Sequence, residues 1–477
     1  MSIDRLPTAG HTGAQAPGPG RATPAFLREL LADPLRLFTR LRTSYGPIVR
    51  VPVGRGGFHL VCGPDAVEQV LVGEQRAYAK GLRRRTMPPG EGIQPLSLLL
   101  GSGLLTSGGD LHRTRRRLIQ PMFHRERIAG YGTAISELSR ATALGWADGS
   151  RREVHTDMSE LTLAVVARTV FGVDVDSEVV RRVRRAVAAN MRLSQLAVLP
   201  GAMRLQQHLP IGPLRAARDA RDDLTAVVME MIEQRRSLDA AGSDLLSTLL
   251  ATRDADTGAP LDDTSIRDEA LTILLAGHET TANAMTWAYH LLATNPQARD
   301  RMHTELDDVL NGRKPTTADL AELPFTRAVF SETLRLYPPA WILLRRTTRD
   351  VTLAGYHLPA DTNVLLSQWV IHRDPTWWPV PEEFRPQRWL TPDPTRPKYA
   401  YFPFGGGTRQ CIGNTFAEME GALALAAISS IRTLTPTPGR PVTPIPRVTL
   451  RPQPLQMTAH PRTPHPTPST HQPRSGT

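Results

Sequence analysis

The hydrophobic positions of this chain recur mostly at helical spacing. From residue 125 to about 253, apolar side chains return every three or four positions, which predicts helices separated by short turns. Earlier in the chain, two short apolar runs at 48–51 and 58–62 flank a glycine-rich turn and predict a β-hairpin. The helices are expected at 129–146, 158–171, 177–197, 213–234 and 245–252. The pattern therefore indicates a mainly α-helical fold with small β-sheets.

The longest predicted helix lies between a cluster of capping residues at 262–265 and the Asn-Pro pair at 295–296. About 30 residues would extend roughly 45 Å. Its apolar middle is interrupted by Gly277, which costs about 1 kcal/mol relative to alanine there. Ala276 and Thr280 share one face, and the threonine hydroxyl can bond back to a carbonyl of the preceding turn. Such local irregularities concentrate at functional sites.

A glycine-rich stretch at 404–413 contains Cys411, one of only two cysteines. Consecutive glycines permit positive φ angles, and a turn of this kind can direct several N–H groups at an anion. A helix is expected from about residue 414, so its positive end and nearby Arg409 would favour the Cys411 thiolate. A thiolate held in this way is a nucleophile or a metal ligand. The alternative is a buried structural cysteine in a glycine-rich turn.

Two further patterns pair charges on helices. His112 and Arg116 are four residues apart, so they share a helix face that suits a carboxylate or phosphate. The alternative is a solvated, arginine-rich helix. Glu332 and Arg335 are three residues apart among apolar neighbours, which predicts a buried ion pair. A long apolar loop at 86–106 suits ligand binding, unless it simply packs on the core.

Together these motifs resemble the cytochromes P450 over about residues 25–457. The haem-thiolate loop pattern of that family is filled by Phe404, Gly407, Arg409, Cys411 and Gly413. The resemblance implies a cytochrome P450 fold with haem b, in which Cys411 is the axial ligand of iron and Arg409 pairs with a propionate. A thiolate ligand of haem iron favours O–O cleavage.

The resemblance assigns roles to the other motifs. The residues Ala276, Gly277, Glu279 and Thr280 match the oxygen-activation motif of the family. By this resemblance, Thr280 donates a hydrogen bond at the oxygen site, Glu279 helps deliver protons, and the small residues let the haem lie against the helix. His112 and Arg116 would pair with haem propionates. An arginine after the apolar run 340–344 would be another propionate partner, either Arg345 or the adjacent Arg346.

The remaining expected residues are structural or substrate-lining. Arg388 would complete a structural triad with Glu332 and Arg335 that pins the segment before the cysteine loop. In the family, the loop matching 86–106 covers the substrate pocket. The candidate pocket residues are Leu100, Leu105, Thr272, Ala340, Trp341 and Ile342.

Composition and charge bear on the compartment and the partners. Two cysteines make no disulfide framework, and no run of 18 apolar residues or signal-peptide core is present, so we expect a soluble, cytoplasmic protein without a membrane span. The net charge of +11 comes almost entirely from arginine. No nucleic-acid motif occurs. No flavin or Fe–S motif occurs either, so electrons from NAD(P)H would arrive through a separate ferredoxin and ferredoxin reductase. An acidic ferredoxin could dock on Arg113, Arg115, Arg117, Arg385 and Arg396.

The ends of the chain, 1–24 and the Pro/Thr-rich 458–477, are expected to be disordered. Between them, the resemblance implies a monooxygenase that inserts one oxygen atom from O₂ into an apolar small molecule. Its residues look most like bacterial P450s acting on terpenes or fatty acids in specialised metabolism. The alternatives are a peroxygenase or non-oxygenating haem enzyme of the same fold, and a haem-based sensor or carrier without turnover.

Overall fold

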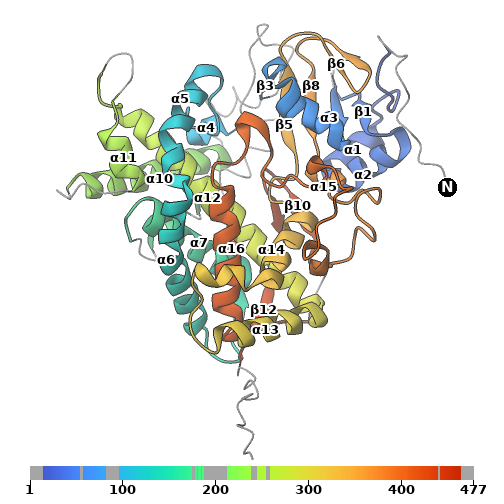
Figure 1. Cartoon of the computed structure of the whole chain (residues 1–477). Coiled ribbons are helices and arrows are strands. Elements are labelled where there is room, and N and C mark those ends of the chain that lie inside the picture. Colours follow the sequence, from blue (N-terminus) through green and yellow to red (C-terminus); the bar gives the residue numbers. More distant parts are fainter. Residues whose placement is uncertain are drawn as a thin grey trace, which may run out of the picture.

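The largest sheet and the long helices occupy different parts of this molecule. The computed structural model describes residues 14–53, 57–81, 96–174, 178–179, 181–183, 185–186, 212–237, 244–253, 258–438 and 441–462. In Figure 1 the long helices gather around α12 and α16, while β1, β3, β5, β6 and β8 lie together beside the N-terminal helices. A P450-like mainly α architecture was expected, and the arrangement agrees with that expectation.

Most of the described chain is helical, and four of the five helices predicted within 125–253 are present. The fifth, at 177–197, lies mostly outside the described residues. The helices are α1 Pro24–Ala32, α2 Pro34–Tyr45, α3 Pro64–Glu68, α4 Ser97–Leu100, α5 Gly109–Ile119, α6 Arg125–Leu144, α7 Val154–Val170, α10 Gly212–Arg236, α11 Leu245–Ala251, α12 Asp263–Thr294, α13 Pro296–Leu310, α14 Pro324–Leu336, α15 Gln368–Ile371 and α16 Asn414–Ser429.

The strands form four small sheets among the described residues. The largest has the order β1-β2-β8-β5-β3 and is antiparallel except where β2 meets β8; another has the order β4-β12-β9. The predicted hairpin is β1 paired with β2. The strands are β1 Ile48–Val51, β2 Phe58–Val61, β3 Tyr78–Lys80, β4 Arg151–Glu153, β5 Leu343–Thr347, β6 Val351–Leu353, β7 Tyr356–Leu358, β8 Asn363–Leu366, β9 Arg432–Pro436, β10 Pro444–Pro446, β11 Leu450–Pro452 and β12 Gln456–Pro461.

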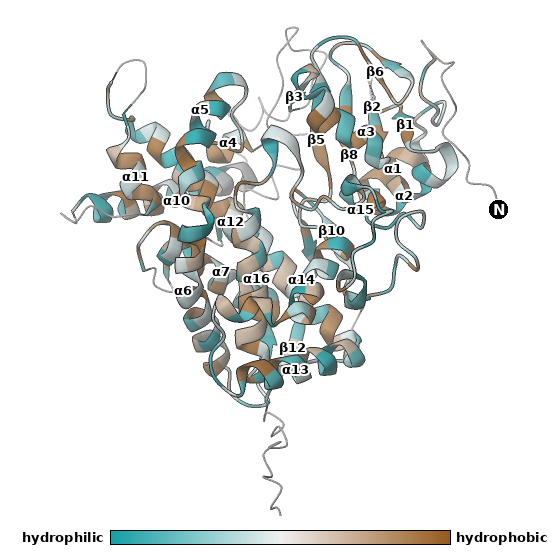
Figure 2. Cartoon of the chain, in the orientation of Figure 1, coloured by the Kyte–Doolittle hydropathy of each residue, from teal (hydrophilic) through white to brown (hydrophobic). Residues whose placement is uncertain are grey.

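Helix α12 is the centre of the helical part. It spans 32 residues, begins after Asp262, whose side chain accepts from the Ser265 N–H at 2.9 Å, and ends before Pro296. Most of its residues are buried against α7, α14 and α16, as expected for a helix that is apolar on nearly every face. Helix α5, by contrast, is coloured largely hydrophilic in Figure 2. A ligand near the cysteine loop would therefore meet an apolar surface on α12 and a polar surface on α5.

The ordered chain extends beyond both predicted domain boundaries. Ala16 is buried, and Pro17 accepts a hydrogen bond from the Arg50 N–H at 2.8 Å. At the other end, β12 continues to Pro461, and Arg462 pairs with Asp307. These segments are held by backbone hydrogen bonds and an ion pair. Such contacts produce no pattern of apolar positions that the sequence could reveal. The expectation of disorder for residues 14–24 and 458–462 was therefore wrong.

Candidate active site

The glycine-rich stretch folds back on itself in front of α16. Gly405 and Gly407 adopt φ angles of +70° and +64°, which disfavour residues with a side chain. The Cys411 N–H donates to the Phe404 carbonyl at 2.9 Å and closes the turn. Helix α16 begins three residues after the cysteine. The geometry predicted for this loop is therefore present.

The Cys411 thiol is solvent-accessible, yet much of its surroundings is protein. Burial raises its pKa, while the Gly413 N–H and the charge of Arg116 act in the opposite direction. The expected stabilising charge was Arg409, so the structure corrects that assignment to Arg116. Among the described residues, no group of three or more His, Cys, Asp and Glu could hold a metal ion.

Five basic side chains gather near this loop, from α5, β3, β5 and the loop itself. They are His112, Arg116, Arg345, Arg409 and Lys80, the last of which sequence reasoning missed. Burial, followed by the charges of Arg409, Arg116, Lys80 and Arg345, lowers the pKa of His112 to about 4. Burial and Arg116 lower the pKa of Arg409 to about 10, and its buried Nη1 has no hydrogen-bond partner. Buried cations without a carboxylate require an anion, and the two propionates of a haem would meet that need.

The geometry distinguishes Arg345 from Arg346. Because successive strand residues point to opposite faces, only one of them can face the cation cluster. Arg346 forms an ion pair with Asp361. Burial and the charge of Arg409 lower the pKa of Arg345 to about 10, so Arg345 is the member that faces the cluster.

The middle of α12 carries an open face within an otherwise buried helix. Ala276 is exposed and Thr280 is partly exposed, whereas residues 270–275 are buried. The Thr280 hydroxyl donates to the Ala276 carbonyl at 2.6 Å, as the sequence suggested. Gly277 serves a different contact, because a Cβ there would lie 2.9 Å from Val166 of α7. A small residue at 276 leaves room for a flat cofactor against the helix.

Glu279 is tied into a buried ion pair. Two Arg451 nitrogens donate to its carboxylate: Nε to Oε1, and Nη2 to Oε2 at 2.6 Å. The Thr449 hydroxyl and the Asn283 amide each donate to Oε1 at 3.1 Å. Burial raises the pKa of Glu279, but Arg451, with His278 and His155, lowers it to about 2. In this arrangement Arg451 favours the ionised carboxylate of Glu279. Arg451 lies 172 residues further along the chain, where no local motif reveals it.

Glu420 on α16 shows the opposite electrostatics and was not among the expected residues. Its side chain is 1% exposed, and neither carboxylate oxygen makes a hydrogen bond of normal geometry to the protein. Burial raises its pKa to about 8, and the Thr281 hydroxyl beside it offsets only part of that rise. Burial therefore favours the protonated carboxyl of Glu420, which lies beside Thr281, the residue after Thr280. A glutamate within an apolar helical pattern is the one sequence signal that could have identified it.

Comparison with known proteins agrees with this geometry. The model of the family described as Cytochrome P450 matches residues 17–459. The chain belongs to the cytochrome P450 family. It is therefore an oxidoreductase of the monooxygenase type, and the family implies a haem cofactor and the use of O₂. The lone Cys411, the cation cluster and the open face of α12 all fit that cofactor.

Several relatives of this P450 come from Streptomyces. It is 39% identical to cyclooctatin synthase of Streptomyces melanosporofaciens, covering 90% of this chain and 92% of the relative. It is 37% identical to cyclooctat-9-en-7-ol 5-monooxygenase of the same organism, covering 90% and 91%. Pentalenene oxygenase of Streptomyces avermitilis is 34% identical, covering 91% and 95%.

A solved structure supports the fold assignment. The heme domain of cytochrome P450DA superposes with a TM-score of 0.81 at 26% identity, covering 95% of this chain and 99% of that one. None of the helices that the structure describes combines the length and apolar character of a membrane span.

The triad of this P450 brings together three residues from two segments. Arg335 contacts Glu332 through two bonds of 2.9 and 2.8 Å, and Arg388 Nε donates to the same carboxylate at 3.0 Å. Trp389 Nε1 adds a bond of 2.8 Å. Glu332 and Arg335 are both fully buried, so every member depends on the others for neutralisation and hydrogen bonds. This arrangement supports the structural role expected for the triad.

The candidate pocket residues have different surroundings. Trp341 stacks on Phe38 and donates to the Arg447 carbonyl at 2.8 Å, so it belongs to the core around the β-sheet. Leu100 is buried in the helical core, and Thr272 lies beneath the loop that follows α4. The expectation that Trp341 and Leu100 line the pocket therefore stays a prediction, made for two side chains that pack within the core. The remaining candidates are partly exposed: Leu105, Ala340 and Ile342.

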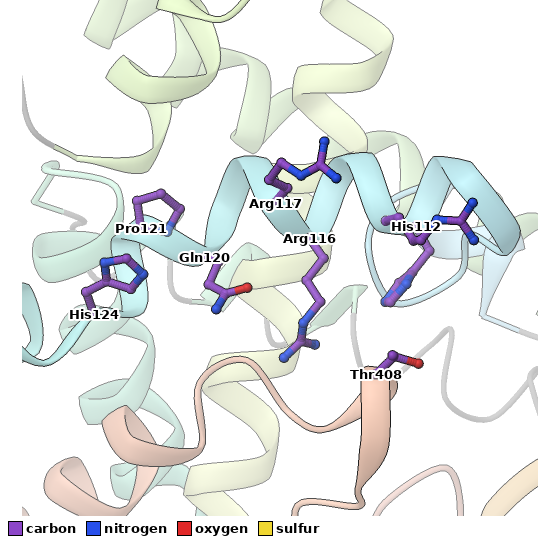
Figure 3. A pocket seen from close by; sticks show the side chains of 8 residues that line it. His112, Arg116, Arg117, Gln120, Pro121, His124 and Thr408 are labelled. Atoms are coloured by element: carbon purple, nitrogen blue, oxygen red, sulfur yellow. The ribbon is translucent and has the colours of Figure 1, made fainter. Parts of the chain in front are cut away.

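A groove of about 430 Å³ lies between α5 and the cysteine loop. In Figure 3, His112 and Arg116 point from α5 towards the loop that carries Thr408, whereas Arg117 points away from it. Arg115 does not belong to this surface, because it is buried and pairs with Glu269 at 2.9 Å. The groove is lined by His112, Arg113, Arg116, Arg117, Gln120, Pro121, His124 and Thr408.

Proposed function

We propose that this P450 oxidises an apolar, polycyclic terpenoid, using electrons from a ferredoxin and ferredoxin reductase. The observation that carries the proposal is the open face of α12, where the Thr280 hydroxyl stands next to exposed Ala276. The relatives named for cyclooctat-9-en-7-ol and pentalenene match nearly the whole chain and support the substrate class. A fatty acid, the other substrate class suggested by the sequence, has no such support.

The residues on this face have separable tasks. When bound through Cys411, haem supplies the iron centre at which O₂ is activated and an oxygen atom is transferred. Thr280 can release its bond to the Ala276 carbonyl and hold a water at the same face. Glu279 is ionised beside Arg451, so it receives and passes a proton only when that ion pair opens or solvent reaches it. Proton delivery therefore begins at Thr280, before Glu279 takes part.

The electron donor is proposed from charge. Arg113, Arg117 and His124 are exposed around the groove between α5 and the cysteine loop. Arg113 pairs with Asp110, and Arg385 and Arg396 pair with Glu383 and Asp393, so these three add less positive charge than Arg117. A basic rim of this kind attracts an acidic protein and brings its redox centre near the cysteine loop. NAD(P)H would reduce that carrier through its reductase.

Binding and turnover test the proposal directly. The haem-loaded enzyme is titrated with pentalenene, a polycyclic diterpene alcohol and palmitic acid, and the Soret shift reports displacement of water. We expect a terpenoid to bind and, with ferredoxin, reductase and NADPH, to yield a product carrying one ¹⁸O atom from ¹⁸O₂. Binding of palmitic acid alone would overturn the substrate class.

Two further outcomes separate the alternatives. Product that forms only with hydrogen peroxide would identify a peroxygenase. Ligand binding without NADPH consumption or product, for every compound and donor, would identify a carrier or sensor. Either result would refute the proposed monooxygenase reaction while leaving family membership intact.

A further inference from the structure

Four residues at four-residue spacing form one ridge along α12. They are Asp268, Thr272, Ala276 and Thr280. Ala276 is exposed and Thr280 is partly exposed, whereas Thr272 and Asp268 are only 2% and 4% exposed. Each residue lies about 6 Å further along the helix than the one before it. The open face of α12 therefore ends abruptly between Ala276 and Thr272.

Loop 101–106, which follows α4, covers the ridge at Thr272. A Cβ added to Gly103 would stand 2.2 Å from the Thr272 hydroxyl oxygen and 2.6 Å from the Asp268 carbonyl oxygen. Residue 103 can therefore carry no side chain while the loop keeps this position. The Thr272 hydroxyl makes no hydrogen bond to the part of the chain that the structure describes, so this contact presses on the loop without holding it.

Two carboxylates of α12 hold the loop down. The Ser102 N–H donates to Asp268 at 2.7 Å. The Leu104 N–H donates to Glu269 at 3.0 Å. Gly101 permits the first contact, because its φ is +59° and a Cβ there would lie 2.1 Å from the Asp268 carboxylate. We call these two hydrogen bonds from the loop backbone to α12 the clasp.

Hydrogen bonds within the loop tie its two ends together. The Thr106 hydroxyl donates to the Gly101 carbonyl at 2.7 Å. The Ser107 N–H donates to the Gly103 carbonyl at 2.9 Å. The clasp therefore sets the position of the whole loop, including Leu105, which is partly exposed and was expected to line the substrate pocket.

We propose that Asp268 and Glu269 are positioning residues for substrate selection, because they seat loop 101–106 on Thr272 and fix where the space beside α12 ends. The inference rests on the terpenoid oxidation proposed above and deepens it by naming what limits the size of the substrate. With the loop seated, the open face begins at Ala276. With the loop released, about 6 Å more of the ridge is accessible, so the clasp favours a smaller terpenoid over a larger one.

A glycine substitution tests the seat of the loop. Gly103→Ala places a methyl group where Thr272 stands, so the loop must move away from α12. Gly108→Ala is the matched control, because Gly108 has an ordinary φ of −126° and nothing lies within 4 Å of its added Cβ. The Soret shift gives the Kd of each haem-loaded protein for pentalenene and for a larger diterpene alcohol.

We expect Gly103→Ala to raise the Kd for pentalenene, relative to the Kd for the diterpene alcohol, by roughly tenfold, the effect of a methylene-sized misfit in an apolar pocket. Gly108→Ala should keep the wild-type ratio. A ratio that is unchanged in a Gly103→Ala protein with the normal CO spectrum would overturn the proposal.

Removal of one anchor tests the clasp without adding volume. Asp268→Ala is preferred to a change at Glu269, because Glu269 also pairs with Arg115 of α5. Ser102 is exposed, so its N–H is open to solvent once the bond to Asp268 is lost. Its hydrogen–deuterium exchange should be roughly tenfold faster in the variant, since hydrogen bonds to charged groups contribute about that factor.

The same variant links the clasp to selection. The ratio of the two Kd values should shift in Asp268→Ala in the same direction as in Gly103→Ala. Asp263→Ala, which removes an exposed carboxylate at the start of α12, should change neither the exchange nor the ratio. Unchanged exchange at Ser102 would refute the clasp, and faster exchange with an unchanged ratio would refute its role in selection. Wild-type protein that binds neither terpenoid would instead refute the proposed function.

Discussion

Replacing Glu420 with glutamine should remove a pH-dependent cost to stability. The carboxyl is 1% exposed, and burial raises its pKa from 4.5 to about 8. Between those values the folded chain binds a proton that the unfolded chain does not, so stability falls as pH rises through this window. At about 1.4 kcal/mol for each pKa unit, the full effect is about 5 kcal/mol above pH 8. No charged group contributes to the shift, and the nearby Thr281 only reduces it.

The assay is urea unfolding of wild type and Glu420→Gln at pH 6 and pH 8. Because glutamine does not titrate, the free-energy gap between the proteins should change by roughly 2 kcal/mol in favour of the variant at pH 8. Glu322→Gln, a change at an exposed glutamate, provides the control and should show a constant gap. A constant gap for Glu420→Gln as well would mean that the residue is ionised or hydrated, and the burial argument would fail.

Three further predictions concern the site. Cys411→Ser should abolish the strongly red-shifted Soret band of the reduced CO complex, and persistence of that band would remove Cys411 as the ligand. Thr280→Ala should keep haem and substrate binding but divert electrons to hydrogen peroxide, measured as peroxide formed per NADPH; unchanged coupling would contradict a proton-handling role. Arg451→Gln leaves Glu279 buried without its partner, so it should lower stability by about 3 kcal/mol at pH 7. In that variant the pKa of Glu279 should rise from about 2, so the fall in coupling on the acid side should move to higher pH. Arg451→Lys keeps a positive charge and should show a smaller loss of stability and a smaller pH shift.

Local signals predicted the parts of the site that local chemistry determines. The expected limits of the long helix, 262 and 295, fall within a residue of α12 because a cap and a proline define them. The turn around Cys411 followed from its glycines in the same way.

Residues whose roles depend on distant partners were missed or misassigned. Arg451 neutralises Glu279 and Lys80 joins the cations only after folding, and neither belongs to a motif. The stacking of Phe38 on Trp341 also joins distant segments, and an apolar strand run does not reveal such a partner. Glu420 lacks a charged partner altogether, so only its burial reveals it.

The sheet β4-β12-β9 has a consequence for biosynthesis. Glu153 of β4 pairs with Gln456 of the central strand β12. Because β12 is synthesised last of the three strands, β4 cannot pair until almost the whole chain has been made. At about 5–20 residues per second, ribosomes need roughly 15–60 s for that interval. Lys80 and Cys411 are separated in much the same way, so the growing polypeptide cannot assemble both sides of the cofactor cradle. Nascent chains stalled before Cys411 is made should therefore retain no haem, and cofactor capture belongs to the finished protein.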